Sequence, residues 1–231
     1  MIAKEQNIAL LIVGNEALKN VDWKDYANYC FDREKGFRKL AFIHLDNFIK
    51  STETWNLVKK IDFVKFLFPF FENLPEADYG PFPQPLSDKL IKPTLEIWCE
   101  IEKIDNNPFR WYGKYYGSEY HLFKAIEINK EDDIARQILL RRWTNNINYS
   151  VHHLPEGYLG DPFEDLKLGD KIKEQISQLT TSKNRENWTR EIEHELELVK
   201  NYVDWKISKH HDFSKWGQEN NRQTSYKWKG N

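Results

Sequence analysis

Two adjacent histidines lie at the centre of the segment SVHHLPEGYLGD, which spans residues 150–161. Histidine titrates near neutral pH and is also a common metal ligand, so the pair could transfer protons or hold an ion. Neighbouring residues of a helix point in different directions, however, so His152 and His153 cannot hold one ion while the helix persists. Pro155 explains why a helix would stop here, and the exposed carbonyl groups of a last turn favour histidine.

A polar stripe runs along the helix that precedes this segment. Its members recur at intervals of four, three and four on a mainly apolar surface: Arg142, Asn146, Tyr149 and His153. Polar groups on such a surface need hydrogen-bond partners or a ligand. We favour an internal network that fixes the register of the helices; the alternative is a polar cleft. The acidic side of a cleft would come from three residues of the following segment: Glu156, Asp161 and Asp165. The acids near Pro162 also suit the first turn of a new helix.

Other catalytic and metal motifs are incomplete. The segment EHELE at 193–197 has the start of a zinc protease motif, but that chemistry needs a second histidine where Leu198 stands. The chain has no glycine-rich phosphate loop and no GxSxG turn. We therefore assign no catalytic residue and expect no metal and no cofactor.

Composition indicates a globular protein that needs neither metal nor disulfide to fold. The 231 residues include 40% apolar and 30% charged side chains, and the formal net charge is −2. There is thus no overall positive charge to draw the chain onto nucleic acid or an anionic membrane. Cys30 and Cys99 have no CxxC partner, so we expect two free thiols and a cytoplasmic location. No segment is long and apolar enough to predict a membrane span.

Apolar residues recur with helical spacing along almost the whole chain, which predicts an all-α fold. Leu40, Leu45, Phe48 and Ile49 mark the apolar side of one predicted helix, for example. Glycines in GKYYG, residues 113–117, are expected to permit close helix contact or a helix end. We expect stacked antiparallel helix pairs in an irregular bundle or a short repeat-like array.

Two segments interrupt this pattern. Four prolines fall within residues 74–86, so we expect a loop that crosses the surface there. We expect residues 1–231 to form a single domain, with this loop as its candidate subdomain boundary. Residues 210–231 are basic and show little apolar periodicity. We expect this tail to be irregular, or ordered only where Trp216, Tyr226 and Trp228 dock.

The stretch SEYHLFKAIEINKEDDIARQIL resembles the junction between helices in a tetratricopeptide array. Ser118, Leu122, Ala125 and Ile128 fall at that family's small and apolar positions, although Lys130 stands where the family has proline. The resemblance covers about residues 109–153 and implies helix-pair packing and, by analogy, peptide binding. The stretches FRWYGKYYG and HHLPEGYLGD are similar to those of a group of helical bacterial proteins. The chain also resembles, in general style, helical immunity proteins that neutralise toxins.

These observations favour a protein that binds another protein, with an immunity or antitoxin role against a toxin domain as the sharpest hypothesis. One alternative is a small hydrolase or transferase that uses His153, Arg142 and a loop carboxylate. A second alternative is RNA binding through the basic aromatic tail, although we favour no nucleic-acid partner and no membrane partner.

Overall fold

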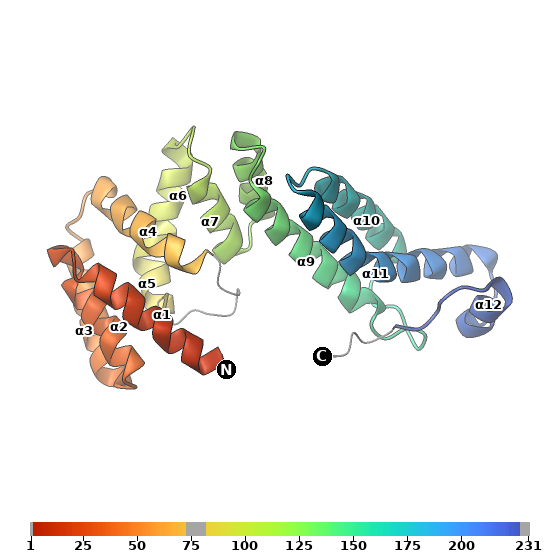
Figure 1. Ribbon diagram of the computed structural model, residues 1–231, viewed down its shortest axis with the longest axis horizontal. Coiled ribbons are helices and arrows are strands. Elements are labelled where there is room, and N and C mark those ends of the chain that lie inside the picture. The colour runs from red at the N-terminus through yellow and green to blue at the C-terminus, as the bar shows by residue number, and fades with distance from the viewer. Residues whose placement is uncertain (1, 73–81, 227–231) are drawn as a thin grey trace. The chain divides into compact units, whose positions relative to one another are not determined.

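The computed structural model describes residues 2–72 and 82–226 (Figure 1). Every regular element within these ranges is a helix, so the predicted all-α fold is confirmed. None of the helices in the described ranges combines the length and the apolar character needed to cross a membrane.

The chain divides into two compact units, Met1–Ile128 (unit 1) and Asn129–Asn231 (unit 2). The proline-rich segment predicted as a boundary belongs to unit 1, and residues 74–81 of that segment lie outside the described residues. The division between Ile128 and Asn129 falls inside the stretch that resembles a tetratricopeptide junction.

Unit 1 begins with three helices, of which the middle one packs against both others. They are α1 (Ile2–Ala17), α2 (Lys24–Glu34) and α3 (Arg38–Thr52), with a short 3-10 turn η1 (Val21–Trp23) before α2. The remaining helices of the unit are α4 (Leu57–Phe71), α5 (Gln84–Leu86), η2 (Ser87–Ile91), α6 (Lys92–Ile101), α7 (Asn107–Tyr116) and α8 (Glu119–Ile128). Short connections join α2 to α3 and α7 to α8, and each pair packs together.

Aromatic side chains form the core of unit 1. Phe63 of α4 packs edge-on against Tyr26 of α2, with ring centroids 5.1 Å apart, and lies 4.8 Å from the ring of Phe48 of α3. Trp55 packs edge-on against Phe48 at 5.6 Å. Each such pair stabilises the fold by about 0.5–1.5 kcal/mol beyond the contribution of the apolar area that it buries. They fix how α2, α3 and α4 lie together.

Prolines shape the helices of unit 1 without breaking all of them. Pro69 lies in the last turn of α4, which ends two residues later at Phe71. Elements α5, η2 and α6 follow one another without interruption, and Pro93 lies in the first turn of α6. The segment η2 before it is π-helical. A π turn relieves the clash between a proline ring and the preceding carbonyl groups, so the helical path continues through Pro93.

Glycines set the approach of α7 to α8, as the sequence predicts. A Cβ atom on Gly113 would lie 2.6 Å from Leu122 Cγ and 3.0 Å from the Leu122 backbone nitrogen. Only glycine therefore lets these two helices pack at this distance. Gly117 ends α7 with a left-handed φ of 76°, a conformation that costs glycine nothing.

Unit 2 contains α9 (Asp133–Val151), α10 (Pro162–Ser177), α11 (Ser182–Ser208) and α12 (Phe213–Asn220). Side chains at the N-terminal ends of these helices accept backbone hydrogen bonds: Asp132, Asp161, Thr181 and Asp212. Helix α9 packs against both α10 and α11, and Figure 1 shows α10 beside α11. The buried surface of α9 is consequently wide and includes Arg136, Thr144 and Ser150 as well as apolar residues.

The tail, for which the sequence predicts an irregular segment, contains a regular helix. Residues 213–220 form α12, because Asp212 caps the helix and Phe213 and Trp216 are buried. Beyond it the backbone nitrogen of Tyr226 donates to the Leu154 carbonyl at 3.2 Å. The expectation that aromatics would order this segment therefore holds for Trp216 and Tyr226, whereas Trp228 lies outside the described residues.

Candidate functional site

The predicted polar stripe lies on the surface of unit 2. Arg142 is half-buried, whereas Asn146, Tyr149 and His153 are exposed. The expectation of an internal network along this stripe is therefore wrong, because three of its four members face solvent. Apolar residues occur all round α9, and its buried side is centred elsewhere, on Leu140, Trp143 and Ile147.

The members of the stripe are spread along the helix. Helix α9 ends at Val151, and a rise of about 1.5 Å per residue separates Arg142 from that end by roughly 14 Å along the axis. Two groups that act on one small substrate must reach the same few atoms. The catalytic pairing of the enzyme alternative would therefore require the side chains of Arg142 and His153 to span this distance.

The acidic residues proposed for the cleft serve local structure or face solvent. Asp161 accepts a hydrogen bond of 2.9 Å from the backbone nitrogen of Phe163 at the start of α10. Asp165 accepts a hydrogen bond of 2.7 Å from the Tyr158 hydroxyl. Burial, with this hydrogen bond as the next cause, raises the pKa of that phenol. Glu156 is exposed. The first two carboxylates fix the segment between α9 and α10 rather than aim at Arg142.

The histidine pair occupies the turn after α9. His152 Nδ1 donates to the Tyr149 carbonyl at 2.6 Å, and the His152 and His153 rings lie 4.0 Å apart in a tilted arrangement. Within residues 9–72 and 82–226, no three His, Cys, Asp or Glu side chains are grouped so that they could hold a metal ion.

A serine and a histidine are in contact in unit 1, at the start of α8. Ser118 Oγ lies 2.7 Å from His121 Nδ1, and the His121 backbone nitrogen approaches the same hydroxyl at 3.5 Å. A nucleophile would need such a partner, but the spacing of three residues at a helix start is that of a helix cap. Burial also lowers the pKa of His121, which favours its neutral form. We assign the pair to capping.

A surface that the sequence analysis did not identify lies at the turn between α2 and α3. We call it the basic apolar patch, and it consists of Lys35, Gly36, Phe37, Arg38, Lys39, Leu40 and Ile43. Phe37, Leu40 and Ile43 are 58%, 45% and 56% exposed, which is high for large apolar side chains that lie together. Exposed apolar side chains in a group mark interaction sites more often than isolated ones do.

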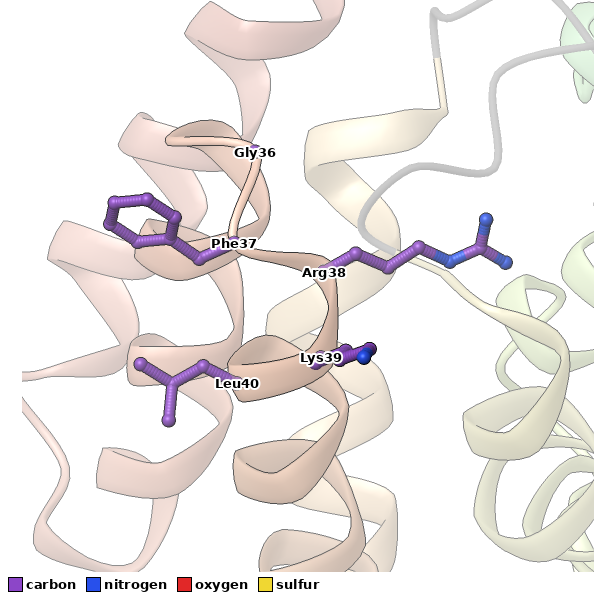
Figure 2. A pocket seen from close by; sticks show the side chains of 5 residues that line it. All are labelled: Gly36, Phe37, Arg38, Lys39 and Leu40. Carbon is purple, nitrogen blue, oxygen red and sulfur yellow. The ribbon is translucent and has the colours of Figure 1, made fainter.

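The turn itself presents these side chains. Gly36 has a left-handed φ of 81°, which reverses the chain between α2 and α3. Figure 2 shows Phe37 and Leu40 extending to one side of the first turn of α3 and Arg38 extending to the other. Residues 36–40 line an open depression of about 560 Å³. An open depression of similar size, about 480 Å³, lies in unit 2 and is lined by Pro155, Gly217 and Thr224 among others.

The sequence analysis missed this patch because it placed Leu40 on the apolar side of α3. The buried side of α3 instead carries Ala41, Leu45, Phe48 and Ile49, and Leu40 is turned away from it. The signal that could have revealed the patch is the run KGFRKL, in which three cations lie close to a phenylalanine and a leucine.

Comparison with protein-family models, with curated proteins and with solved structures gives no match for this chain. An all-α fold alone is compatible with many activities.

Proposed function

We propose that this chain is a protein-binding module and that it binds its partner through the basic apolar patch of unit 1. The observation that carries the proposal is the joint exposure of Phe37, Leu40 and Ile43 on one turn and the first two turns of a helix. Each of these side chains would gain about 1.5–3 kcal/mol on full burial, and somewhat less from its present half-exposed state. Covering them with a partner is therefore favourable.

The depression at residues 36–40 supports the same proposal. The depression is open, so a partner surface would lie across it rather than fill it. Phe37 and Leu40 extend in the same direction and provide the apolar contact for such a surface (Figure 2). A toxin domain is the partner we propose first, in line with the resemblance to helical immunity proteins.

Site-specific photocrosslinking tests the proposal. A photoreactive phenylalanine analogue replaces Phe37, and in a second variant it replaces Phe163, a 45% exposed phenylalanine at the start of α10 in unit 2. We expect a discrete crosslinked protein from position 37 and not from position 163 in cells of the natural host. The purified partner should bind the wild-type chain and bind the L40S/I43S variant at least about tenfold more weakly.

Two outcomes would overturn the proposal. One is the same crosslinking pattern from both positions, which would show that position 37 makes only random encounters. The other is a partner whose affinity is unchanged by L40S/I43S while that variant keeps the wild-type melting temperature. Co-expression with the products of adjacent genes then tests the toxin hypothesis separately, because a toxin partner should co-purify with this chain and lose its activity.

A further inference from the structure

A small hollow in unit 1 lies where the start of α4 meets η2 and α6. Its volume is about 120 Å³, and it is more enclosed than the two larger depressions described above. All three elements contribute to its apolar lining, which consists of Leu57, Leu90, Pro93 and Ile97. A cavity of about 150 Å³ in another protein holds one benzene molecule, so this hollow has room for about five carbon atoms. None of its lining residues belongs to the basic apolar patch.

The deepest part of the hollow is apolar. Leu90 and Thr94 are the most buried residues of the lining, with 1% and 2% exposure. Among the described residues that line the hollow, Thr94 has the one uncharged polar side chain, and its hydroxyl donates to the Leu90 carbonyl at 2.6 Å. A polar group that entered here would lose its hydrogen bonds to water without replacement. The part of a ligand that enters must therefore be apolar.

Two lysines complete the lining, Lys60 of α4 and Lys89 of η2. Lysine packs its aliphatic stem along apolar surface and keeps its ammonium group in water, so these two charges belong at the mouth of the hollow. In the part of the chain that the structure describes, neither lysine forms an ion pair. The neighbouring Lys59, in contrast, pairs with Asp22 at 2.7 Å.

The described lining of the hollow contains no acidic side chain. The acids closest to it in sequence are Asp62, Asp88 and Glu96, which are all exposed and lie outside the lining. Glu96 accepts a hydrogen bond of 3.0 Å from the Tyr112 hydroxyl. Helix α4 begins at Leu57, and the positive end of its dipole adds to the charge of the two ammonium groups. The mouth of the hollow is thus cationic and its interior is apolar.

We infer that this hollow binds a small carboxylic acid with a short apolar tail. The tail of about five carbons enters the hollow between α4, η2 and α6, and the carboxylate meets the ammonium groups of Lys60 and Lys89. A free short-chain acid carries this chemistry, and so does the last residue of a peptide that ends in an apolar side chain. The inference concerns a different surface from the basic apolar patch and does not depend on it.

Nuclear magnetic resonance of the isotope-labelled full chain tests the inference with hexanoate as the probe. We expect saturable shifts of the amide signals of residues 89–97 and a Kd on the order of 1 mM, as suits so small a molecule. Acetate lacks the tail and hexanamide lacks the charge, so each should bind at least several-fold more weakly. Added salt should weaken hexanoate, because it screens exposed charges.

N-acetyl-leucine distinguishes the two sources of the ligand. It presents a carboxylate beside an apolar side chain as the end of a peptide does. Tighter binding of N-acetyl-leucine than of hexanoate would identify a peptide end as the natural ligand, and weaker binding would identify a free acid. The binding site itself is supported in either case.

Charge removal at the mouth provides the matched test in the protein. K60Q/K89Q should weaken hexanoate about tenfold, because two attractions are lost. The control K171Q/K173Q makes the same change in net charge at exposed positions of α10 and should leave the affinity unchanged. Circular dichroism and thermal melting of each variant check that its fold is intact.

A second pair of variants tests the apolar wall. Ile97 and Ile101 are both exposed isoleucines of α6, at 46% and 57%, but only Ile97 lines the hollow. Ile97→Ala should weaken hexanoate several-fold because the tail loses apolar contact, whereas Ile101→Ala should have no effect.

Several results would overturn the inference. They are no saturable shift with hexanoate, equal binding of hexanamide, equal effects of the two lysine pairs, or shifts centred outside residues 57–60 and 89–97. Such a failure leaves the proposed function standing, because crosslinking from position 37 does not involve the hollow. A failure of that crosslinking likewise leaves the hexanoate site standing.

Discussion

The side-chain amide of Asn148 on α9 donates a hydrogen bond of 2.5 Å to the hydroxyl oxygen of Tyr226, which lies beyond α12. The Tyr226 backbone nitrogen also donates to the Leu154 carbonyl, and Asn201 on α11 donates to the Gln223 carbonyl at 2.9 Å. Residues 223–226 are thus attached to α9, to the turn after it and to α11. The tail is therefore part of the fold of unit 2.

Tyr226→Phe should lower the stability of unit 2 by about 1 kcal/mol, because the half-buried Asn148 amide loses its acceptor. Faster amide hydrogen exchange at residues 148–154 would report this local effect. Tyr120→Phe is the matched control, since Tyr120 is 64% exposed on α8 of unit 1. Identical exchange in the two variants would show that the Asn148–Tyr226 hydrogen bond contributes nothing to stability.

A second prediction concerns the close approach of α7 and α8. Gly113→Ala should destabilise unit 1 by about 1–3 kcal/mol, because the new methyl group overlaps both the side chain and the backbone of Leu122. Gly169→Ala in α10 meets only the end of the Leu196 side chain, which can move. Since alanine favours helix over glycine by about 1 kcal/mol, G169A should be nearly neutral. Urea denaturation of both variants compares them, and equal midpoints would contradict the argument.

The fold followed from the sequence because each helix carries its own signals. Pro162 after Asp161 marks the start of α10, and Gly117 marks the end of α7; both lie where the structure has those boundaries. Helical spacing of apolar residues then decides the fold class without any knowledge of which helices meet.

The candidate site did not follow, because it depends on which side of each helix is covered. Apolar residues surround α9, which packs on two helices, so periodicity alone did not identify its buried side or show that Tyr149 is exposed. In α3 the exposed side carries Leu40 and Ile43, which resemble core residues until the packing of α2 is known. Exposed apolar residues of a binding surface thus imitate a core in the sequence.

A third prediction concerns the start of α9. Both the backbone nitrogen and the hydroxyl of Thr180 donate to the Asp133 carboxylate, the hydroxyl at 2.6 Å. Asp133→Ala should therefore lower the free energy of unfolding by about 1 kcal/mol, a modest amount because the site is exposed. Glu131→Ala removes an acid of equal charge two residues earlier that does not contact Thr180, and it should have a smaller effect. A larger loss for Glu131→Ala would mean that general electrostatics outweigh the contact with Thr180.

The last prediction concerns the two cysteines, which are free thiols as the sequence predicts. Burial raises the pKa of Cys30 and of Cys99 to about 12. At pH 8 only about one in 10⁴ of such thiols is ionised, compared with roughly a quarter of unperturbed thiols with a pKa near 8.5. We therefore expect iodoacetamide to label neither residue of the native protein at pH 8 on the timescale that labels free cysteine.

Both thiols should react once guanidinium unfolds the chain, because unfolding restores their ordinary pKa. Cys30→Ser and Cys99→Ser separate the two signals by mass spectrometry. Cys99 provides the more demanding test, since it is only half-buried, whereas Cys30 is fully buried. Native labelling of Cys99 at the rate of a free thiol would show that its surroundings on α6 are hydrated, and would contradict the raised pKa.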